Sequence, residues 1–175
     1  MGFDLSGINP KINKKLDDTS LYGMIESIQD WKKRWEMQDN LNKEEKTEFW
    51  EQCEQYHDDN PGIYFRNNVW WWRPLWAFVC DHCNDILTEE EMTSGSYNDG
   101  REINANKASK ISKRLYSLLK DGTVDAYSME YEEQINKMKE SEDKDVQFMA
   151  SYPFSKENVE HFALFCQESG GFVIC

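Results

Sequence analysis

The sequence has no apolar run long enough to cross a membrane. A membrane-spanning helix needs about 20 consecutive apolar residues, and the longest apolar stretch, residues 69–80, is interrupted by Arg73 and Pro74. The segment after Pro10 is charged and polar, so the first residues do not resemble a secretory signal peptide either. These two absences predict a soluble cytoplasmic protein.

Cysteine and histidine are scarce: the chain has five cysteines and three histidines. Without an export signal, an odd number of cysteines predicts free thiols rather than a disulfide scaffold. The tetrapeptide Cys80-Asp81-His82-Cys83 places two thiols and an imidazole within one turn, but no second ligand pair has the spacing of a zinc site. Core thiols on one helix face are the favoured interpretation, so we predict no metal ion and no cofactor.

The sequence motifs of common enzymes are also missing. There is no nucleophile elbow, no phosphate loop with its lysine, no His-Glu-x-x-His pair and no His-x-Glu deaminase pattern. Carboxylates are plentiful, yet no pair of them can be assigned to a pocket from the sequence. The sequence therefore favours a binding protein over an enzyme and offers no catalytic residue.

Basic residues are outnumbered, and 33 acidic against 20 basic residues give a net charge of −13. A surface with this charge repels nucleic acids and anionic membranes, so we predict no direct binding to either. Acidity leaves another function open, because an acidic protein can imitate a nucleic acid and occupy a basic groove of a partner protein.

A chain of 175 residues can bury one sizeable core, which predicts a single domain over residues 1–175. Short apolar-polar alternation predicts brief strands near residues 3–8, 63–66 and 172–175, and the last of them needs residues 3–8 or 64–65 as its partner. Helical periodicity dominates elsewhere. We therefore predict a mainly α fold of the α+β type, with a two- or three-stranded β element that includes the C-terminal strand.

Helix boundaries follow from capping residues and proline. Asn104 and Ser155 precede segments in which apolar residues recur every three or four positions, so each is predicted to cap a helix. Pro74 suits the first turn of a helix that ends near Leu87. Residues 131–138 predict only a loose helix, followed by a mobile loop.

Residues 11–60 differ from the rest in being highly charged. Leu21 and Ile25 belong to a run at helical spacing, and a second run includes Phe49. The break between the runs, at Asp39-Asn40, predicts an antiparallel helical hairpin inserted into the domain.

The segment Tyr64–Trp76 combines arginine, asparagine and tryptophan, and no carboxylate occurs between Pro61 and Val79. Its guanidinium groups suit phosphate or carboxylate, its amides add donors and acceptors, and its indole faces can stack on a base or hold a cation. Alternatively, the tryptophans are core residues, each burying on the order of 200 Å². Three consecutive tryptophans cannot all face inward from a helix, so at least one must face outward or meet another element.

A tight turn at residues 97–100 is the second candidate site. Its Asn-Asp-Gly sequence favours positive φ and can present backbone N–H groups beside a carboxylate, although a plain turn needs no function. Together the two segments give the candidate ligand-binding residues Arg66, Asn67, Asn68, Trp70, Trp71, Trp72, Arg73, Tyr97, Asn98 and Asp99.

Several motifs together resemble a family of small proteins encoded by bacteriophages and prophages. They are the opening Met-Gly-Phe-Asp, the segment Tyr64-Phe65-Arg66-Asn67-Asn68-Val69-Trp70-Trp71-Trp72-Arg73-Pro74-Leu75-Trp76, the turn Tyr97-Asn98-Asp99-Gly100, and Tyr152-Pro153-Phe154-Ser155 through Ser169-Gly170-Gly171-Phe172. The resemblance covers residues 1–10 and 62–175 and implies a phage setting without a settled biochemistry. Shorter members lack the charged insert, and this chain lacks the cysteine-rich insert of other members, so no zinc site carries over.

Two functions follow as hypotheses. In the first, a phage-encoded protein binds a small anionic or nucleotide-type ligand, such as a signal of host defence, and lowers its free concentration in the host cytoplasm. In the second, an acidic protein inhibits a host protein, and the insert at residues 11–60 provides the contact surface. A homo-oligomer is compatible with both.

Overall fold

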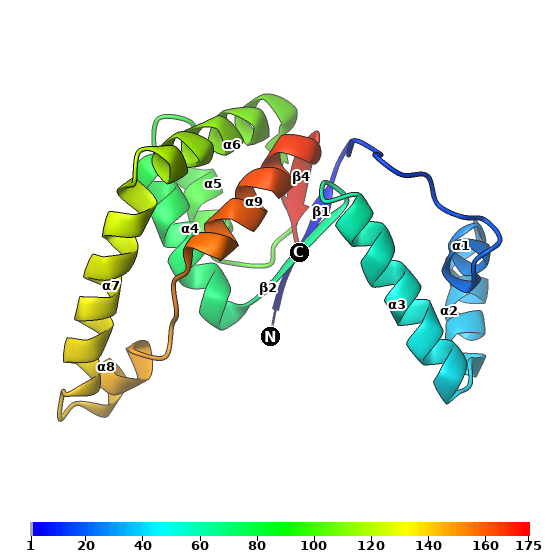
Figure 1. The fold of residues 1–175 in the computed structure, drawn as a ribbon, viewed down its shortest axis with the longest axis horizontal. Helices are drawn as coiled ribbons and strands as arrows, with labels where there is room; N and C mark the ends of the chain where they lie inside the picture. The colour runs from blue at the N-terminus through cyan, green and yellow to red at the C-terminus, as the bar shows by residue number, and fades with distance from the viewer. Residues whose placement is uncertain (1) are drawn as a thin grey trace. The chain divides into compact units, whose positions relative to one another are not determined.

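Four short segments form one antiparallel sheet in the computed structural model, which describes residues 2–175 (Figure 1). The C-terminal strand β4 (Gly171–Ile174) pairs with β1 (Gly2–Gly7), where Leu5 lies opposite Ile174, so one of its two predicted partners is confirmed. Tyr64 and Phe65 pair instead with the other side of β1. Across the sheet, the strands follow in the order β2 (Tyr64–Asn68), β1 (Gly2–Gly7), β4 (Gly171–Ile174) and β3 (Arg101–Asn104).

The sheet has four strands, so the predicted two- or three-stranded element is too small. The strand that the sequence did not reveal is β3, in which Ile103 lies opposite Phe172 of β4. Ile103 is the single apolar residue of β3, so no alternation is visible in the sequence. The mainly helical α+β class itself is confirmed.

Contacts between residues divide the chain into two compact units. The first comprises the residues up to Lys11 together with Gly62–Cys175, and the second comprises Ile12–Pro61. No helix within residues 2–175 is long and apolar enough to span a membrane. Besides the sheet, the described residues of the first unit form α4 (Val69–His82), α5 (Glu89–Ser94), α6 (Ala105–Lys120), α7 (Thr123–Lys139), α8 (Lys144–Met149) and α9 (Lys156–Glu168).

The two predicted helix caps are present. Asn104 Oδ1 accepts a hydrogen bond from the backbone N–H of Lys107 (3.0 Å) at the start of α6. Ser155 Oγ accepts one from the backbone N–H of Asn158 (3.2 Å) at the start of α9. Each bond satisfies a donor that the helix itself leaves free, which explains why both helices begin where the sequence predicts.

α4 begins earlier and ends earlier than predicted. Asn68 caps it by accepting hydrogen bonds from the backbone N–H groups of Trp70 (3.0 Å) and Trp71 (3.2 Å). Pro74 therefore lies inside the helix rather than in its first turn, and the helix stops before Leu87. A proline inside a helix costs the helix one backbone hydrogen bond. The helix nevertheless starts before Pro74, because Asn68 caps its first turn.

α7 is a full helix, not the loose helix predicted for residues 131–138. It spans Thr123–Lys139, and α8 follows directly after a short turn. The rings of Tyr127 and Tyr131 pack on Phe154, with centroid distances of 4.8 and 5.8 Å. This packing joins segments that are distant in the sequence, so periodicity within α7 could not reveal it.

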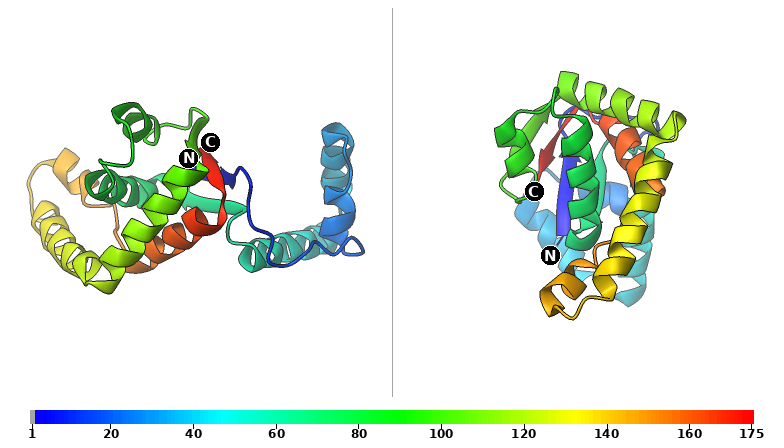
Figure 2. Two further views of the ribbon diagram at one scale, coloured as in Figure 1. Left: turned by 90° about the horizontal axis from the view of Figure 1, so that it is seen from above. Right: turned by 90° about the vertical axis from the view of Figure 1, so that its left-hand side faces the viewer.

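Alternation along the strands gives the sheet one apolar and one polar face. The polar face includes Asp4, Tyr64 and Arg66. Helices α4, α6 and α9 gather against the sheet (Figures 1 and 2) and cover its apolar face, which places the main core on one side. The apolar face is formed by Phe3, Leu5, Phe65, Ile103, Phe172 and Ile174.

The second unit contains three helices among its described residues, α1 (Leu21–Glu26), α2 (Trp31–Asn40) and α3 (Lys43–Asp59), instead of the two helices of a hairpin. Asp30 caps α2 and Asn42 caps α3, so the break after the first run lies near Leu41 rather than at Asp39-Asn40. A small separate core is built from Tyr22, Ile25, Phe49 and Cys53.

Asn60 holds the two ends of the second unit together. Its side chain is fully buried, and Oδ1 accepts hydrogen bonds from the backbone N–H groups of Asn13 (2.8 Å) and Lys14 (3.0 Å). Nδ2 donates to the carbonyl oxygens of Lys14 (3.0 Å) and Tyr56 (2.9 Å). All four hydrogen-bonding positions of the amide are therefore occupied.

Removing the second unit is expected to leave the first unit folded. Lys11 N donates to Glu168 O (2.8 Å), and Gly62 lies so close to the same carbonyl that a Cβ on it would be 2.2 Å away. Two glycines can therefore join Lys11 to Gly62. Since no residue of Ile12–Pro61 belongs to the main core, circular dichroism should record a cooperative thermal transition for the deletion variant.

A matched deletion serves as the control for this experiment. Removing α9, whose aromatic residues Phe162 and Phe165 belong to the main core, should abolish the cooperative transition. If deletion of Ile12–Pro61 abolished it as well, the insert would be part of the folding unit that contains the sheet.

Candidate functional site

Trp72 is the innermost of the three consecutive tryptophans. It is fully buried, and its ring stacks between those of Phe3 (5.3 Å between centroids) and Trp76 (5.2 Å). Its Nε1 donates a hydrogen bond to Gly95 O (2.7 Å). A Cβ on Gly95 would lie 2.1 Å from Trp76 Cε2, so only glycine allows this approach. Trp72 thus has a structural role.

Trp70 and Trp71 are only half-buried. The ring of Trp70 packs on those of Tyr152 (4.8 Å) and Phe148 (5.2 Å). The carbonyl oxygen of Trp71 accepts a hydrogen bond from Asn158 Nδ2 (3.5 Å). The helical rotation of about 100° per residue separates the three side chains, so the triplet does not form one stacking surface.

The two asparagines of the segment are engaged within the protein. Asn67 is buried, and its Nδ2 donates to Asn158 Oδ1 (2.9 Å). Asn68 Oδ1 is the cap of α4. Both amides therefore position backbone and side chains, and they do not meet in a common site.

Arg66 does not share a groove with Arg73. Along β2 the side chains alternate, and Arg66 lies on the polar face of the sheet, where its Nε is 3.5 Å from Asp4 Oδ1. Tyr64 Oη also donates to Asp4 Oδ1. The segment lacks acids in the sequence but not in space, because β1 brings Asp4 beside it.

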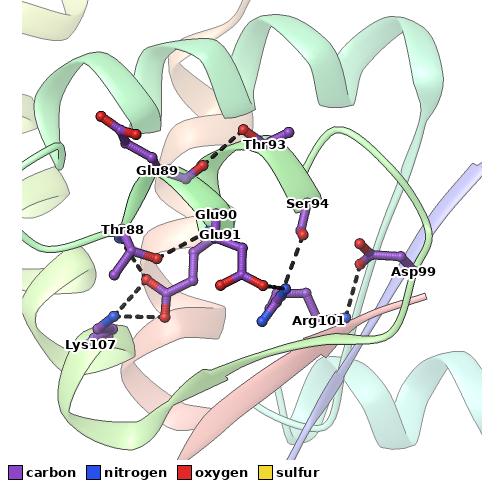
Figure 3. A network of polar contacts seen from close by, with 9 residues as sticks. All are labelled: Thr88, Glu89, Glu90, Glu91, Thr93, Ser94, Asp99, Arg101 and Lys107. Carbon is purple, nitrogen blue, oxygen red and sulfur yellow. Dashed lines mark hydrogen bonds and ion pairs between the residues drawn. The ribbon is translucent and has the colours of Figure 1, made fainter.

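The turn at residues 97–100 is held by polar side chains of its own, of which Figure 3 shows Asp99. Asp99 Oδ1 accepts a hydrogen bond from the backbone N–H of Arg101 (3.1 Å), and Asn98 Nδ2 donates to Gly2 O (2.8 Å). Gly100 has a φ of +78°, as the Asn-Asp-Gly sequence predicts. Asn98 and Asp99 therefore have structural partners.

Figure 3 also shows an ionic network beside this turn. Lys107 Nζ donates to both carboxylate oxygens of Glu91, at 2.7 and 2.6 Å. Glu91 in turn forms a capping box with Thr88 at the start of α5. Burial opposes the charged form of Glu91, but the bonds from Lys107 and Thr88 outweigh it, so its pKa lies below the ordinary value.

Glu91→Gln is expected to lower the free energy of unfolding by about 1–2 kcal/mol at pH 7, because glutamine keeps the cap but loses the charge-assisted bonds to Lys107. A lowered folded-state pKa contributes stability above the ordinary pKa, and this contribution is lost as the pH falls. Urea unfolding should therefore find that the difference in stability between the two proteins shrinks as the pH falls through the lowered folded-state pKa of Glu91. The control Glu89→Gln, at an exposed position of the same turn, should change stability by less than about 0.5 kcal/mol.

Arg73 extends from α4 toward Tyr152. Its Nη1 donates to Tyr152 Oη (2.9 Å), and its guanidinium carbon lies 5.6 Å from the centroid of that ring. Arg73 lines two hollows, one of about 380 Å³ that it shares with Tyr97 and one of about 320 Å³ that it shares with Tyr152. The hydrogen bond directs the guanidinium group of Arg73 toward Tyr152. The positive charge of Arg73 therefore lies at the second hollow.

We call this second hollow the tyrosine groove. Arg73, Pro74 and Ala77 of α4 form one wall, and Met149 and Tyr152 close it. The opposite wall is formed by α7 residues Tyr127, Tyr131, Gln134, Ile135 and Met138. No carboxylate is among these described lining residues. A wider hollow of about 670 Å³ adjoins the groove, since Tyr131, Ile135 and Tyr152 line both.

The tyrosine rings of the groove are fixed by contacts with each other and with the backbone. Tyr131 Oη donates to Tyr152 O (2.9 Å), and the rings of Tyr127 and Tyr131 stack at 5.9 Å. Burial raises the pKa of Tyr131 to about 12, so its hydroxyl stays neutral. The groove thus offers preformed aromatic surfaces and a single positive charge.

The Cys80-Asp81-His82-Cys83 segment does not gather metal ligands. The ring of His82 packs at a tilt on that of Phe78 (4.2 Å between centroids), and its Nδ1 lies 3.0 Å from Phe78 O. Burial raises the pKa of Cys80 to about 12 and that of Cys83 to about 11, so both remain thiols. Within residues 2–175 no three or more histidine, cysteine or acidic side chains form a metal-binding group.

The sequence pointed to Arg73 but not to the other residues of the groove. Tyr131 lies in a segment with weak periodicity, and Tyr152 stands out in the sequence only as the first residue of the Tyr152-Pro153-Phe154-Ser155 motif. Contact between Arg73 and Tyr152 spans 79 positions. No local spacing signals such a contact.

Comparisons with models of known protein families, with curated proteins and with solved structures give no match. The site is therefore interpreted from its geometry and charge.

Proposed function

We propose that the protein binds a small ligand with an apolar or aromatic body and one anionic group, and that the tyrosine groove is its binding site. The observation that carries this proposal is the state of Arg73. Four of the five arginines form ion pairs with carboxylates. Within residues 2–175 Arg73 has no carboxylate partner, although the protein has an excess of acids.

The guanidinium of Arg73 is suited to hold an anion. It has five N–H donors, and the bond to Tyr152 Oη uses one of them. Tyr152 is itself buried against Trp70, so the arginine is held in place at its tip. A positioned guanidinium loses little side-chain entropy when it binds phosphate or carboxylate in a two-point contact.

The remainder of the groove suits an uncharged, flat body. Small-molecule sites are typically hollows of about 300–1,000 Å³ with apolar walls and few polar groups. The tyrosine groove has this composition, and Gln134 adds one amide that can donate and accept. Met138 and Met149 are flexible and polarisable, so they can adapt to an aromatic ring such as a nucleobase.

The resemblance to phage and prophage proteins suggests a setting for this binding. In an infected host cell, a phage-encoded protein that holds a nucleotide-type signal of host defence lowers the free concentration of that signal. Sequestration needs binding but no chemistry, which agrees with a groove that offers one cation and no carboxylate to act as a base.

Mass spectrometry of the purified protein tests the proposal. Material released by heat denaturation should contain an anionic small molecule in near-stoichiometric amount. Isothermal titration calorimetry with nucleoside monophosphates and cyclic dinucleotides should then show saturable binding to the stripped protein. Co-purification of a host protein without any small molecule, and no heat signal from the panel, would contradict the proposal and favour an acidic protein inhibitor.

A further inference from the structure

α2 of the second unit presents two tryptophans to solvent. Trp31 and Trp35 are 65% and 69% exposed, and no residue of α2 is buried. The two residues are one helical turn apart, so they lie on the same side of α2. Two neighbouring indole rings form a contiguous exposed apolar surface, which makes this side of α2 a candidate contact surface.

Beyond the capping carboxylate of Asp30, the charges in the first and last turns of α2 oppose its helix dipole. Lys32 and Lys33 lie in the first turn, and Asp39 lies in the last turn. The helix dipole is instead stabilised by acidic side chains near the N-terminus and basic side chains near the C-terminus. None of these three residues, nor Glu36, forms an ion pair within residues 2–175. No ion pair among the described residues therefore accounts for the charge order within α2.

We propose that α2 binds α2 of a second copy of this chain in antiparallel orientation. The midpoint between Lys32 and Asp39 falls at Trp35 and Glu36, so a twofold axis there brings Lys32 of each copy level with Asp39 of the other. Lys32 lies on the tryptophan side, because its Nζ is 5.7 Å from the centroid of the Trp31 ring. The antiparallel copy thus gives Lys32 and Asp39, which are both unfavourable for the dipole of their own helix, an oppositely charged partner.

The expected dimer is weak. The exposed parts of Trp31 and Trp35 amount to roughly 300 Å² per copy, which is small beside the roughly 800 Å² per partner of a standard interface. Each copy also carries a net charge of −13. The dimer should therefore be reversible and form only at high protein concentration, at physiological salt, where the Debye length is about 8 Å and limits the long-range repulsion.

Sedimentation equilibrium of the full chain tests the tryptophan contact. The wild-type protein should show a reversible monomer–dimer equilibrium, and Trp35→Ala should weaken it at least about tenfold, because the interface contains the ring twice. Met129→Ala removes a 68% exposed side chain of α7 and should leave the equilibrium unchanged. A wild-type protein that stays monomeric at high micromolar concentration would overturn the proposal.

Charge reversal tests the antiparallel register. Lys32→Glu and Asp39→Lys each place like charges opposite one another, so each variant alone should be monomeric. Both reversals favour α2 itself through its dipole, so lost association does not mean lost folding. An equimolar mixture of the two variants should recover dimers, because both cross pairs become attractive. A mixture that remains monomeric while the wild-type protein dimerises would exclude this register.

These experiments do not depend on the tyrosine groove. The groove is lined by residues of the first unit, and α2 belongs to the second. A failure of ligand binding would leave the dimer intact, and a monomeric protein would leave the ligand-binding proposal standing.

Discussion

Trp72→Ala is expected to lower the free energy of unfolding by about 4 kcal/mol, the largest effect of any substitution considered. The fully buried ring is stacked between Phe3 and Trp76, and alanine cannot fill the space between them. The substitution also removes the donor of the hydrogen bond to Gly95 O. A buried carbonyl without a partner adds roughly 1–3 kcal/mol where water cannot reach it.

Trp71→Ala is the matched control, because it removes the same kind of side chain from the preceding position of α4. Trp71 is half-buried, so its loss should lower the free energy of unfolding by about 1 kcal/mol or less. Urea unfolding followed by tryptophan fluorescence and circular dichroism measures both variants. Equal destabilisation by the two substitutions would mean that Trp72 does not have the core role that its burial indicates.

Local signals in the sequence predicted the parts of the fold that local interactions determine. Asn104 and Ser155 cap helices through bonds to residues three positions later, so the sequence contains both partners of each bond. The C-terminal strand needed a partner, and the alternation around Leu5 supplied it. The start of α4 was predicted wrongly because proline in the first turn is only a preference, and Asn68 satisfies the first N–H groups one turn earlier.

The parts that the sequence did not reveal depend on long-range contacts. β3 is a strand because Ile103 meets Phe172, and α7 extends to Thr123–Lys139 while its tyrosines pack on Phe154. The candidate site has the same origin. Proximity in the sequence grouped Arg66 with Arg73, whereas the alternation of β2 directs Arg66 to the polar face and the helix directs Arg73 to Tyr152.

Arg73→Lys is expected to weaken ligand binding tenfold to hundredfold. A charge-assisted contact to a phosphate or carboxylate contributes about 1.5–3 kcal/mol, and lysine lacks the planar fork that makes two parallel bonds. Folding should change little, because the residue is exposed and forms no ion pair within the described residues. Isothermal titration calorimetry with the compound recovered from the purified protein, or with the tightest nucleotide of the panel, measures the change in dissociation constant.

Arg66→Lys separates a specific effect of Arg73 from a general effect of arginine in the segment Tyr64–Trp76. Arg66 has the same charge and a 68% exposed side chain, but it pairs with Asp4 outside the tyrosine groove. An exposed pair contributes about 1 kcal/mol or less, so both stability and ligand affinity should stay close to the wild-type values. Equal losses of affinity in the two variants would place the anion between the arginines rather than in the groove. An unchanged affinity in Arg73→Lys, with an unchanged melting temperature, would remove Arg73 from the binding site.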